Sequence, residues 1–419
     1  MKTCSLRKSW PVAVVCGVLL GWAPLSAQEA ASDATPKGPS AIVMLADGSL
    51  IASHDLIFEH DGQVSARSEV GEFHWKWEEI LSISLTDAEP RPSRFAALLI
   101  AGDERIHGQV AVATEENIEL KSELFGQVSI PLSAVEGILL AERLAGSAKE
   151  RLINRLRTLP RQGDAFLLAN GDTLLGTASQ LGPENWTIDV DGQPRTVETN
   201  RLQGVALDPR LLDYKKPDEL LVVARFIDGS TLIGKDLVVS EGKCEMTSLV
   251  GPKLSFSWSG EAGSAAMRFD VRGGKARYLS EMTPQRQEIE SFFDAPVEWK
   301  RDANADGEPI RIAGERHDRG IGMRTKMSLD FPVEGYDRFL SMIGIDESAS
   351  GEASVIFRVL VDGKSIFESP AMSLTSPAIP VDLVIDEGKV LTLTVDFADR
   401  GDAGDLANWA SARLVKSKK

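Results

Sequence analysis

The chain has 419 residues, of which 43% are hydrophobic and 26% are charged, and its formal net charge is −16. This length exceeds what a single hydrophobic core usually supports, so we expect two or more domains. A surface this acidic disfavours nucleic acid and anionic membranes as partners, because binding to either depends on Lys and Arg side chains that displace counterions.

The N-terminal segment has the pattern of a Sec signal peptide. Lys2, Arg7 and Lys8 precede an apolar run over residues 10–22, and the small residue Ala27 follows. The apolar run is shorter than the roughly 20 residues that a membrane-spanning helix needs. We therefore expect a signal peptide over residues 1–27, a secreted or periplasmic protein, and no membrane span.

Residues 28–40 are rich in Ala, Pro and Ser, which predicts a disordered linker. Beyond the signal peptide, Cys244 is the one cysteine in the sequence, so no internal disulfide framework is expected. No His or Asp pattern near it suggests a nucleophile, so we expect a small buried residue of a strand.

Residues 41–140 and 164–275 contain a loose repeat that occurs four times. Each unit has an apolar strand, a turn of Gly with Asp or Asn, further short strands and a final apolar run. Pairs such as Asp47-Gly48 and Asn170-Gly171 are typical of tight hairpins. The units resemble small Sm-like β-barrels, which predicts tandem antiparallel barrel-like units.

Residues 141–163 form the one helical pattern in the series. Leu152, Leu156 and Leu159 fall on one stripe with Leu144 and Ala148, and Pro160 ends the pattern. We expect a helix that links the second unit to the third.

The last part of the chain, residues 276–419, contains several ordered signatures. They include Arg277-Tyr278-Leu279, the stretch from His317 to Arg324, Gly344-Ile345-Asp346 and Leu406-Ala407-Asn408-Trp409. In this order they resemble the NPCBM family of carbohydrate-binding modules, first described on family 98 glycoside hydrolases. The resemblance covers residues 276–416 and implies a jelly-roll β-sandwich of the galactose-binding kind, so the fold class is expected to be all-β.

The resemblance also implies a ligand site in the loops at one end of the sandwich. The candidate ligand-binding residues are Arg324, Asp346, Asp405, Asn408 and Trp409. Family members usually carry His at the position of Arg324, whose guanidinium can donate to sugar hydroxyls instead. From the residues alone, Trp409 can either stack on a sugar ring or belong to the core, and Asp346 and Asp405 can either accept from hydroxyls or cap turns.

Asp302, Asn304 and Asp306 have the alternate spacing of the first half of a calcium loop, followed by Gly307. Ala313 stands where the bidentate Glu of such a loop is usually found. A structural calcium ion and a plain polar turn are both compatible with this pattern.

The sequence has no nucleophile elbow, zinc-protease motif or phosphate-binding loop. The β units with their single helix also do not match the alternating pattern of a catalytic (β/α)₈ barrel. We therefore expect a secreted, non-catalytic protein that binds carbohydrate. The alternative is a structural or protein-interaction scaffold of the bacterial cell envelope, with envelope proteins as partners and no sugar binding.

Overall fold

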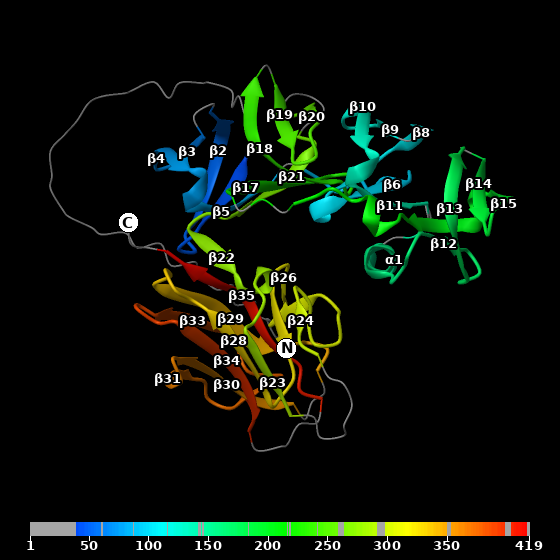
Figure 1. Ribbon diagram of the computed structural model, residues 1–419. Helices are drawn as coiled ribbons and strands as arrows, with labels where there is room; N and C mark the ends of the chain where they lie inside the picture. Colours follow the sequence, from blue (N-terminus) through cyan, green and yellow to red (C-terminus); the bar gives the residue numbers. More distant parts are fainter. Residues whose placement is uncertain are drawn as a thin grey trace, which may run out of the picture. The chain divides into compact units, whose positions relative to one another are not determined.

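The computed structural model describes residues 39–416, apart from residues 60–61, 87, 115, 141–143, 145, 183, 216, 218, 241, 259–263, 291–297, 350–352 and 399–403. The expected signal peptide and most of the expected linker lie outside the described residues. Within them the protein is mostly β, with several antiparallel sheets and one α-helix (Figure 1). In the described part, no helix is both long and apolar enough to cross a membrane.

The four sequence repeats occupy the first two thirds of the described chain. Repeat one comprises β1 (Ala41–Leu45), β2 (Leu50–Phe58), β3 (Gln63–Ser68), β4 (Gly71–Lys76), the 3-10 helix η1 (Trp77–Glu79) and β5 (Ile80–Leu85). Repeat two comprises β6 (Ala97–Ile100), η2 (Ala101–Asp103), β7 (Arg105–His107), β8 (Gln109–Ala113), β9 (Asn117–Ser122), β10 (Gly126–Pro131), η3 (Leu132–Ala134) and β11 (Val135–Leu139). Repeat three comprises β12 (Asp164–Leu168), β13 (Thr173–Leu181), β14 (Asn185–Val190), β15 (Gln193–Glu198), η4 (Thr199–Arg201) and β16 (Leu202–Ala206), with η5 (Pro209–Leu211) after it. Repeat four comprises β17 (Leu221–Phe226), β18 (Thr231–Ser240), β19 (Lys243–Ser248), β20 (Lys253–Ser257) and β21 (Ala266–Arg272).

All four repeats share one pairing pattern. The first strand of each repeat lies between the second and the last, as β1 lies between β2 and β5. The first hairpin turns where the sequence predicts it, because Gly48, Gly171 and Gly229 have positive φ angles of 93°, 93° and 89°. The hairpin prediction is therefore confirmed.

The second strand of repeats one, three and four, and the third strand of repeat two, change register partway along. The irregularities fall between His54 and Ile57 in β2, within β8, within β13, and between Lys235 and Val238 in β18. In β2 and β18 the extra residue is an aspartate with a positive φ angle, 54° at Asp55 and 57° at Asp236. Such a bulge bends a strand, so one strand can pair with the first strand and then with the third.

The repeats are joined to one another through their last strands. β5 of repeat one pairs with β21 of repeat four, and β11 of repeat two pairs with β16 of repeat three. A single hydrophobic core contains residues of all four repeats, including Phe58, Ile138, Phe166 and Phe256, and it also encloses Cys244 of β19. No sheet of the described strands closes into a barrel, so the antiparallel units are confirmed and their barrel form stays a prediction.

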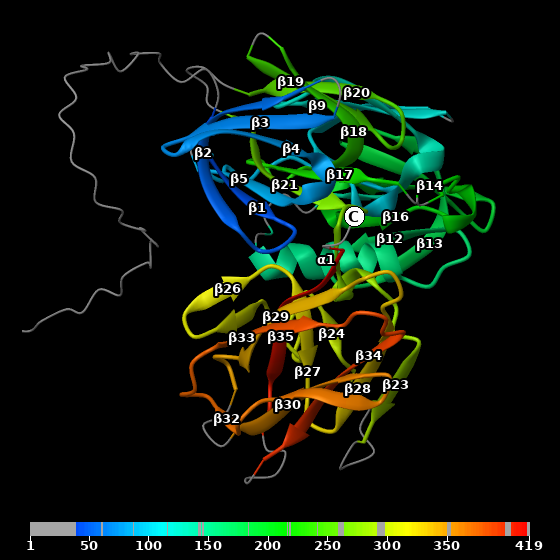
Figure 2. The ribbon, with the colours of Figure 1, turned by 90° about the vertical axis from the view of Figure 1, so that its left-hand side faces the viewer.

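The helix α1 (Gly146–Thr158) packs on the face of the sheet that contains β11 and β16 (Figure 2). Leu152, Ile153 and Leu156 are buried there. A Cβ atom on Gly204 would lie 2.8 Å from Leu156 Cδ1, so the glycine allows the close approach of helix and sheet. Arg157, on the same helix, pairs with Glu136 at 2.9 Å and with Asp103 at 3.1 Å.

The C-terminal part is a β-sandwich of two antiparallel sheets with a core between them (Figure 2). One sheet has the order β24, β27, β35, β29, β33, with β22 also on β35, and the other has β23, β28, β34, β30, β31, with β32 also on β30. Its elements are β22 (Ala276–Tyr278), η6 (Leu279–Glu281), β23 (Arg286–Ile289), β24 (Lys300–Arg301), β25 (Ile310–Ile312), β26 (Glu315–His317), β27 (Gly320–Met323), β28 (Met327–Pro332), β29 (Arg338–Ile345), β30 (Ser354–Val361), β31 (Lys364–Glu368), β32 (Met372–Ser373), β33 (Ile379–Val384), β34 (Val390–Phe397) and β35 (Ala407–Val415).

The alternating pattern of β30 and β34 produces the sandwich core. Val355, Phe357 and Val359 of β30 are fully buried, as are the alternate residues of β34. In the turn between β30 and β31, Asp362 and Gly363 both have positive φ angles, 50° and 78°, as a tight hairpin requires. These strands and this hairpin belong to the β-sandwich that the family resemblance implies.

Candidate functional site

The sandwich carries a buried polar network that centres on Asp346, just after β29. One carboxylate oxygen accepts hydrogen bonds from Asn304 Nδ2 at 3.0 Å and from the Ser348 hydroxyl at 2.6 Å and backbone N–H at 3.1 Å. The other oxygen accepts from Asn408 Nδ2 at 2.8 Å and from the backbone N–H of Arg311 at 3.0 Å. Asp346 is only 1% exposed. Its carboxylate therefore ties four separate segments of the chain together.

These donors also determine the charge state of Asp346. Burial by itself raises the pKa of a carboxyl group, because it disfavours the charged form. The hydrogen bonds from Ser348, from the Arg311 backbone and from Asn304 outweigh burial and hold the pKa of Asp346 below its usual value. The group is therefore a carboxylate at neutral pH and accepts from all its donors at once.

Asn304 connects this network to the turn that follows β24. Its side-chain oxygen accepts from the backbone N–H groups of Asp306 and Glu308, both at 3.0 Å, while its amide group donates to Asp346. The turn lies directly against β27, where a Cβ atom on Gly322 would come within 2.4 Å of the Ala303 carbonyl oxygen. The glycine in the middle of β27 thus lets the turn approach the sheet.

Arg324 and Asp306 form an ion pair at the surface beside this turn. Their side chains are 33% and 51% exposed. Arg324 follows β27, and its backbone N–H donates to Met327 Sδ at 3.4 Å. The pair presents a guanidinium donor and a carboxylate acceptor to solvent, and the Asn304 turn holds the acceptor in place.

The remaining predicted residues lie inside the sandwich. Asp405 is fully buried, and one of its oxygens accepts from the backbone N–H of Ser354 at 2.9 Å. Trp409 is also fully buried and packs edge-on against Phe357 with ring centroids 5.1 Å apart. Its indole therefore belongs to the core in this structure, which is one of the two roles the sequence left open. The side-chain oxygen of Asn408 is buried without a hydrogen-bond partner among the described residues.

The three residues with calcium-like spacing have different protein partners. Asp302 accepts from Arg319 at 2.8 Å and from the Gly320 backbone at 3.1 Å. Asn304 belongs to the Asp346 network, and Asp306 pairs with Arg324. No group of three or more His, Cys, Asp or Glu residues suited to a metal ion occurs in the described parts of the chain. These contacts do not fit a shared cation, so calcium stays a prediction without structural support.

Sequence reasoning missed two members of the network, Ser348 and the backbone N–H of Arg311. Ser348 is two residues after Asp346 and its backbone N–H donates back to that side chain, which is a common local motif of aspartate turns. The contribution of Arg311 has no sequence signal, because any residue there supplies the same N–H group.

Together these features define a β-sandwich module in which a buried polar network underlies an exposed arginine–carboxylate pair. Residues 275–415 are an NPCBM/NEW2 domain, a non-catalytic module of the carbohydrate-binding kind. The family resemblance read from the sequence is thereby confirmed.

Three proteins that are similar to this chain differ in sequence identity and in how much of each chain is covered. A predicted endo-alpha-N-acetylgalactosaminidase of Renibacterium salmoninarum is 27% identical over 116 residues, which are 27% of this chain and 8% of that protein. The chain thus matches only a small part of that relative's length. Among solved structures, CBM51 from Clostridium perfringens GH95 in complex with methyl-galactose is 27% identical, with 33% of this chain and 99% of that chain covered and a TM-score of 0.31. The tandem CBM51 modules of the family 98 glycoside hydrolase from Streptococcus pneumoniae are 14% identical, with 76% and 87% covered and a TM-score of 0.30.

Proposed function

We propose that this protein is secreted or periplasmic, has no catalytic activity of its own, and binds carbohydrate through the surface around Arg324 and Asp306. The single observation that carries the proposal is the NPCBM/NEW2 match over residues 275–415. The exposed ion pair supplies the chemistry, because a guanidinium donates to sugar hydroxyls and a carboxylate accepts from them.

In this proposal the buried residues have a positioning role. Asp346 and Asn408 are too deeply buried to touch a sugar in this conformation, and their hydrogen bonds hold the Asn304 turn in place. Asp306 belongs to that turn, so its carboxylate keeps a defined place beside Arg324. A rigid support of this kind reduces the ordering cost of binding.

A glycan array probed with the full chain tests the proposal, followed by calorimetry on each hit. We expect Arg324→Ala to weaken binding to the best glycan about tenfold, which is the loss typical of hydrogen bonds to a charged group. Arg338→Ala is the matched control, since Arg338 also forms an ion pair on this module, with Asp382. A full array without any hit, or equal affinities for the two variants, would reject this site.

One observation favours a second candidate function, a cell-envelope scaffold without sugar binding. Asp346, Asp405 and Trp409 are all buried, so side chains fill the interior of the loop end where the sequence suggested ligand contacts. A pull-down from an envelope fraction with the full chain, repeated in excess free glycan, separates the two functions. A protein partner that survives the glycan competition supports the scaffold.

A further inference from the structure

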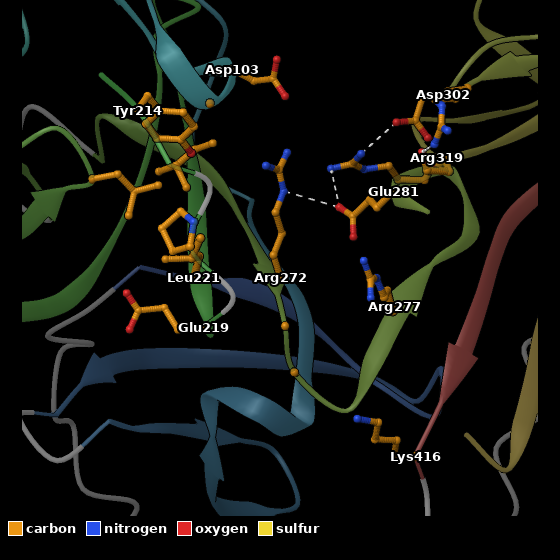
Figure 3. A pocket seen from close by; sticks show the side chains of 18 of the residues that line it. Asp103, Tyr214, Glu219, Leu221, Arg272, Arg277, Glu281, Asp302, Arg319 and Lys416 are labelled. Atoms are coloured by element: carbon orange, nitrogen blue, oxygen red, sulfur yellow. Dashed lines mark hydrogen bonds and ion pairs between the residues drawn. The ribbon is translucent and has the colours of Figure 1, made fainter. Parts of the chain in front are cut away.

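A cavity of about 490 Å³ is lined by the end of β21, by β22 and η6, and by the residues that flank β27 and β35 (Figure 3). Neither Arg324 nor Asp306 lines it. Its volume is within the range of small-molecule sites. Five cationic side chains line it, namely Arg272, Arg277, Arg301, Arg319 and Lys416. So many cations around one cavity are unexpected in a chain with a net charge of −16.

The acidic residues of the cavity do not cancel this charge. Four carboxylates line it, and each is already paired with a cation. Glu281 lies 3.4 Å from Arg272 and 3.5 Å from Arg319, while Asp302 lies 2.8 Å from Arg319, which gives a continuous chain of ion pairs along one wall (Figure 3).

The other two carboxylates pair with cations that do not line the cavity. Asp103 lies 3.1 Å from Arg157, and Glu219 lies 3.2 Å from Lys235. All four acids thus have a cationic partner, two of them from outside the cavity wall, and Arg157 is shared with Glu136. The lining is left with an excess of positive charge.

Three of the cations, Arg277, Lys416 and Arg301, have no carboxylate partner among the described residues, and Arg301 donates to backbone carbonyl oxygens instead. Arg277 is the exposed central residue of β22, and no ion pair or side-chain hydrogen bond joins it to the described part of the chain. Lys416 lies over the ring of Tyr336, with Nζ 5.0 Å from the ring centroid, a contact that leaves its ammonium group without an anion. Both side chains are available to a ligand.

A neutral donor completes the lining. Ser280 is 5% exposed, and its hydroxyl has no hydrogen-bond partner among the described residues. A buried polar group without a partner is costly, so its presence on a cavity wall points to a ligand. Arg301 is held beside it through hydrogen bonds to the Ser280 and Met282 carbonyl oxygens.

We propose that this cavity binds a compact oxyanion group, a sulfate, phosphate or carboxylate, carried by a small organic molecule. Arginine forks match such groups in geometry as well as in charge, and the Ser280 hydroxyl can donate to the same group. The volume leaves room for the organic part of the molecule. This site is separate from the surface around Arg324 and does not depend on carbohydrate binding there.

Calorimetry on the full chain tests the proposal with five probes: inorganic sulfate, inorganic phosphate, glucose 6-sulfate, glucuronate and glucose. We expect at least one anionic probe to bind, glucose to give no heat, and affinity to fall as the salt concentration rises. Comparing the affinities for sulfate and for glucose 6-sulfate shows whether the cavity prefers the free ion or the sugar ester. Binding of glucose as tight as that of the anions, or no binding by any anion, would overturn the proposal.

Variants locate the binding in this cavity. Arg277→Ala and Lys416→Ala should each weaken binding of the best anionic probe about tenfold, the loss typical of hydrogen bonds to charged groups. Arg195→Ala is the matched control, because Arg195 is an exposed arginine in the middle of β15 that does not line the cavity. Arg324→Ala should leave anion binding unchanged, which separates this site from the proposed sugar site. If the two cavity variants bind as tightly as the Arg195 control, the anion lies elsewhere and the assignment is wrong.

Discussion

The repeats and the sandwich each contain a buried carboxylate. In the repeats it connects two separate repeats, and in the sandwich it connects loops of one module. In the repeats, Glu104 is fully buried and accepts from the Ile233 backbone at 2.7 Å and from the Ser248 hydroxyl at 3.1 Å, so it joins repeat two to repeat four. In the sandwich, Asp346 joins loops of one module beneath an exposed ion pair. Buried carboxylates therefore hold separate repeats together in the first region and support a surface in the second.

The comparison predicts that changes in the repeats alter stability alone, whereas changes around Asp346 alter stability and binding together. Four substitutions test this difference, and they are ordered here by the size of the expected change in unfolding free energy.

Trp409→Ala should destabilise the sandwich most, by about 3–5 kcal/mol, because it empties a fully buried site between Phe339 and Phe357. Trp258→Ala in the repeats is its counterpart, since both indole rings are buried and neither indole N–H has a hydrogen-bond acceptor in the described structure. Hydrogen exchange measured peptide by peptide should locate each loss in its own core. Equal loosening of both regions by either variant would contradict the separation of the two cores.

Asp346→Ala should cost about 2–4 kcal/mol, because it leaves the buried amide groups of Asn304 and Asn408 without their acceptor. Glycan affinity should fall with it, and chemical denaturation and calorimetry measure the two effects. Since the folded pKa of Asp346 is below its usual value, its stabilising effect is present above pH 4 or so and is lost as the pH falls through that lowered pKa. Asp362→Ala, in an exposed hairpin turn, is the control for both readouts.

Glu104→Gln should change stability in the opposite direction. Burial raises the pKa of Glu104 to about 7, outweighing its hydrogen bonds from Ile233 and Ser248. Because the folded pKa is higher than the unfolded one, the stability of the native protein is full below about pH 4 and falls as the pH rises through 7. The glutamine keeps an acceptor and removes this loss, so at pH 8 the variant should be more stable by on the order of 1–3 kcal/mol.

Denaturant unfolding between pH 4 and pH 8 measures this difference. Glu72→Gln, at an exposed ion pair with Arg67, is the control and should leave the pH dependence unchanged. A wild-type curve that is flat over this range would show that the Glu104 carboxylate is not destabilised by burial. Glycan binding should be unaffected by either substitution.

Arg324→Ala should have the smallest effect on stability, less than about 1 kcal/mol, because it breaks an ion pair that is partly exposed. It should nevertheless have the largest effect on glycan affinity of the four. Thermal unfolding and calorimetry on the same preparation give both values. A large drop in stability would mean that Arg324 supports the fold, in which case its assignment as a surface contact fails.

The sequence was a good guide to local structure. Asp-Gly and Asn-Gly pairs located the hairpins, because few residues adopt positive φ angles at low cost. The strand pairings between repeats could not be read in this way. β5 pairs with β21 across most of the repeat region, and nothing in either strand specifies its distant partner.

The sequence indicated which residues belong to the candidate site, but it did not indicate which partners their side chains contact. The spacing of Asp302, Asn304 and Asp306 was compatible with a calcium ion and with a polar turn, and spacing does not tell which way an oxygen points. The structure turns these side chains toward Arg319, Asp346 and Arg324. Burial of Asp346 also depends on Asn408, which is distant in sequence and comes near only after β29 and β35 pair.

The last strands pair in a nested order along the sequence. The last strand of repeat one pairs with that of repeat four, and the last strand of repeat two pairs with that of repeat three. Deleting repeat one or repeat four would leave β21 or β5 as an unpaired edge strand. Such an edge can pair with another chain and promotes aggregation. The inner and outer pairs are also joined to each other, because β18 of repeat four pairs with β7 of repeat two and the Glu104 carboxylate of repeat two accepts from the Ile233 backbone of repeat four. Removing any one repeat would therefore break strand pairing or buried contacts with at least one other repeat.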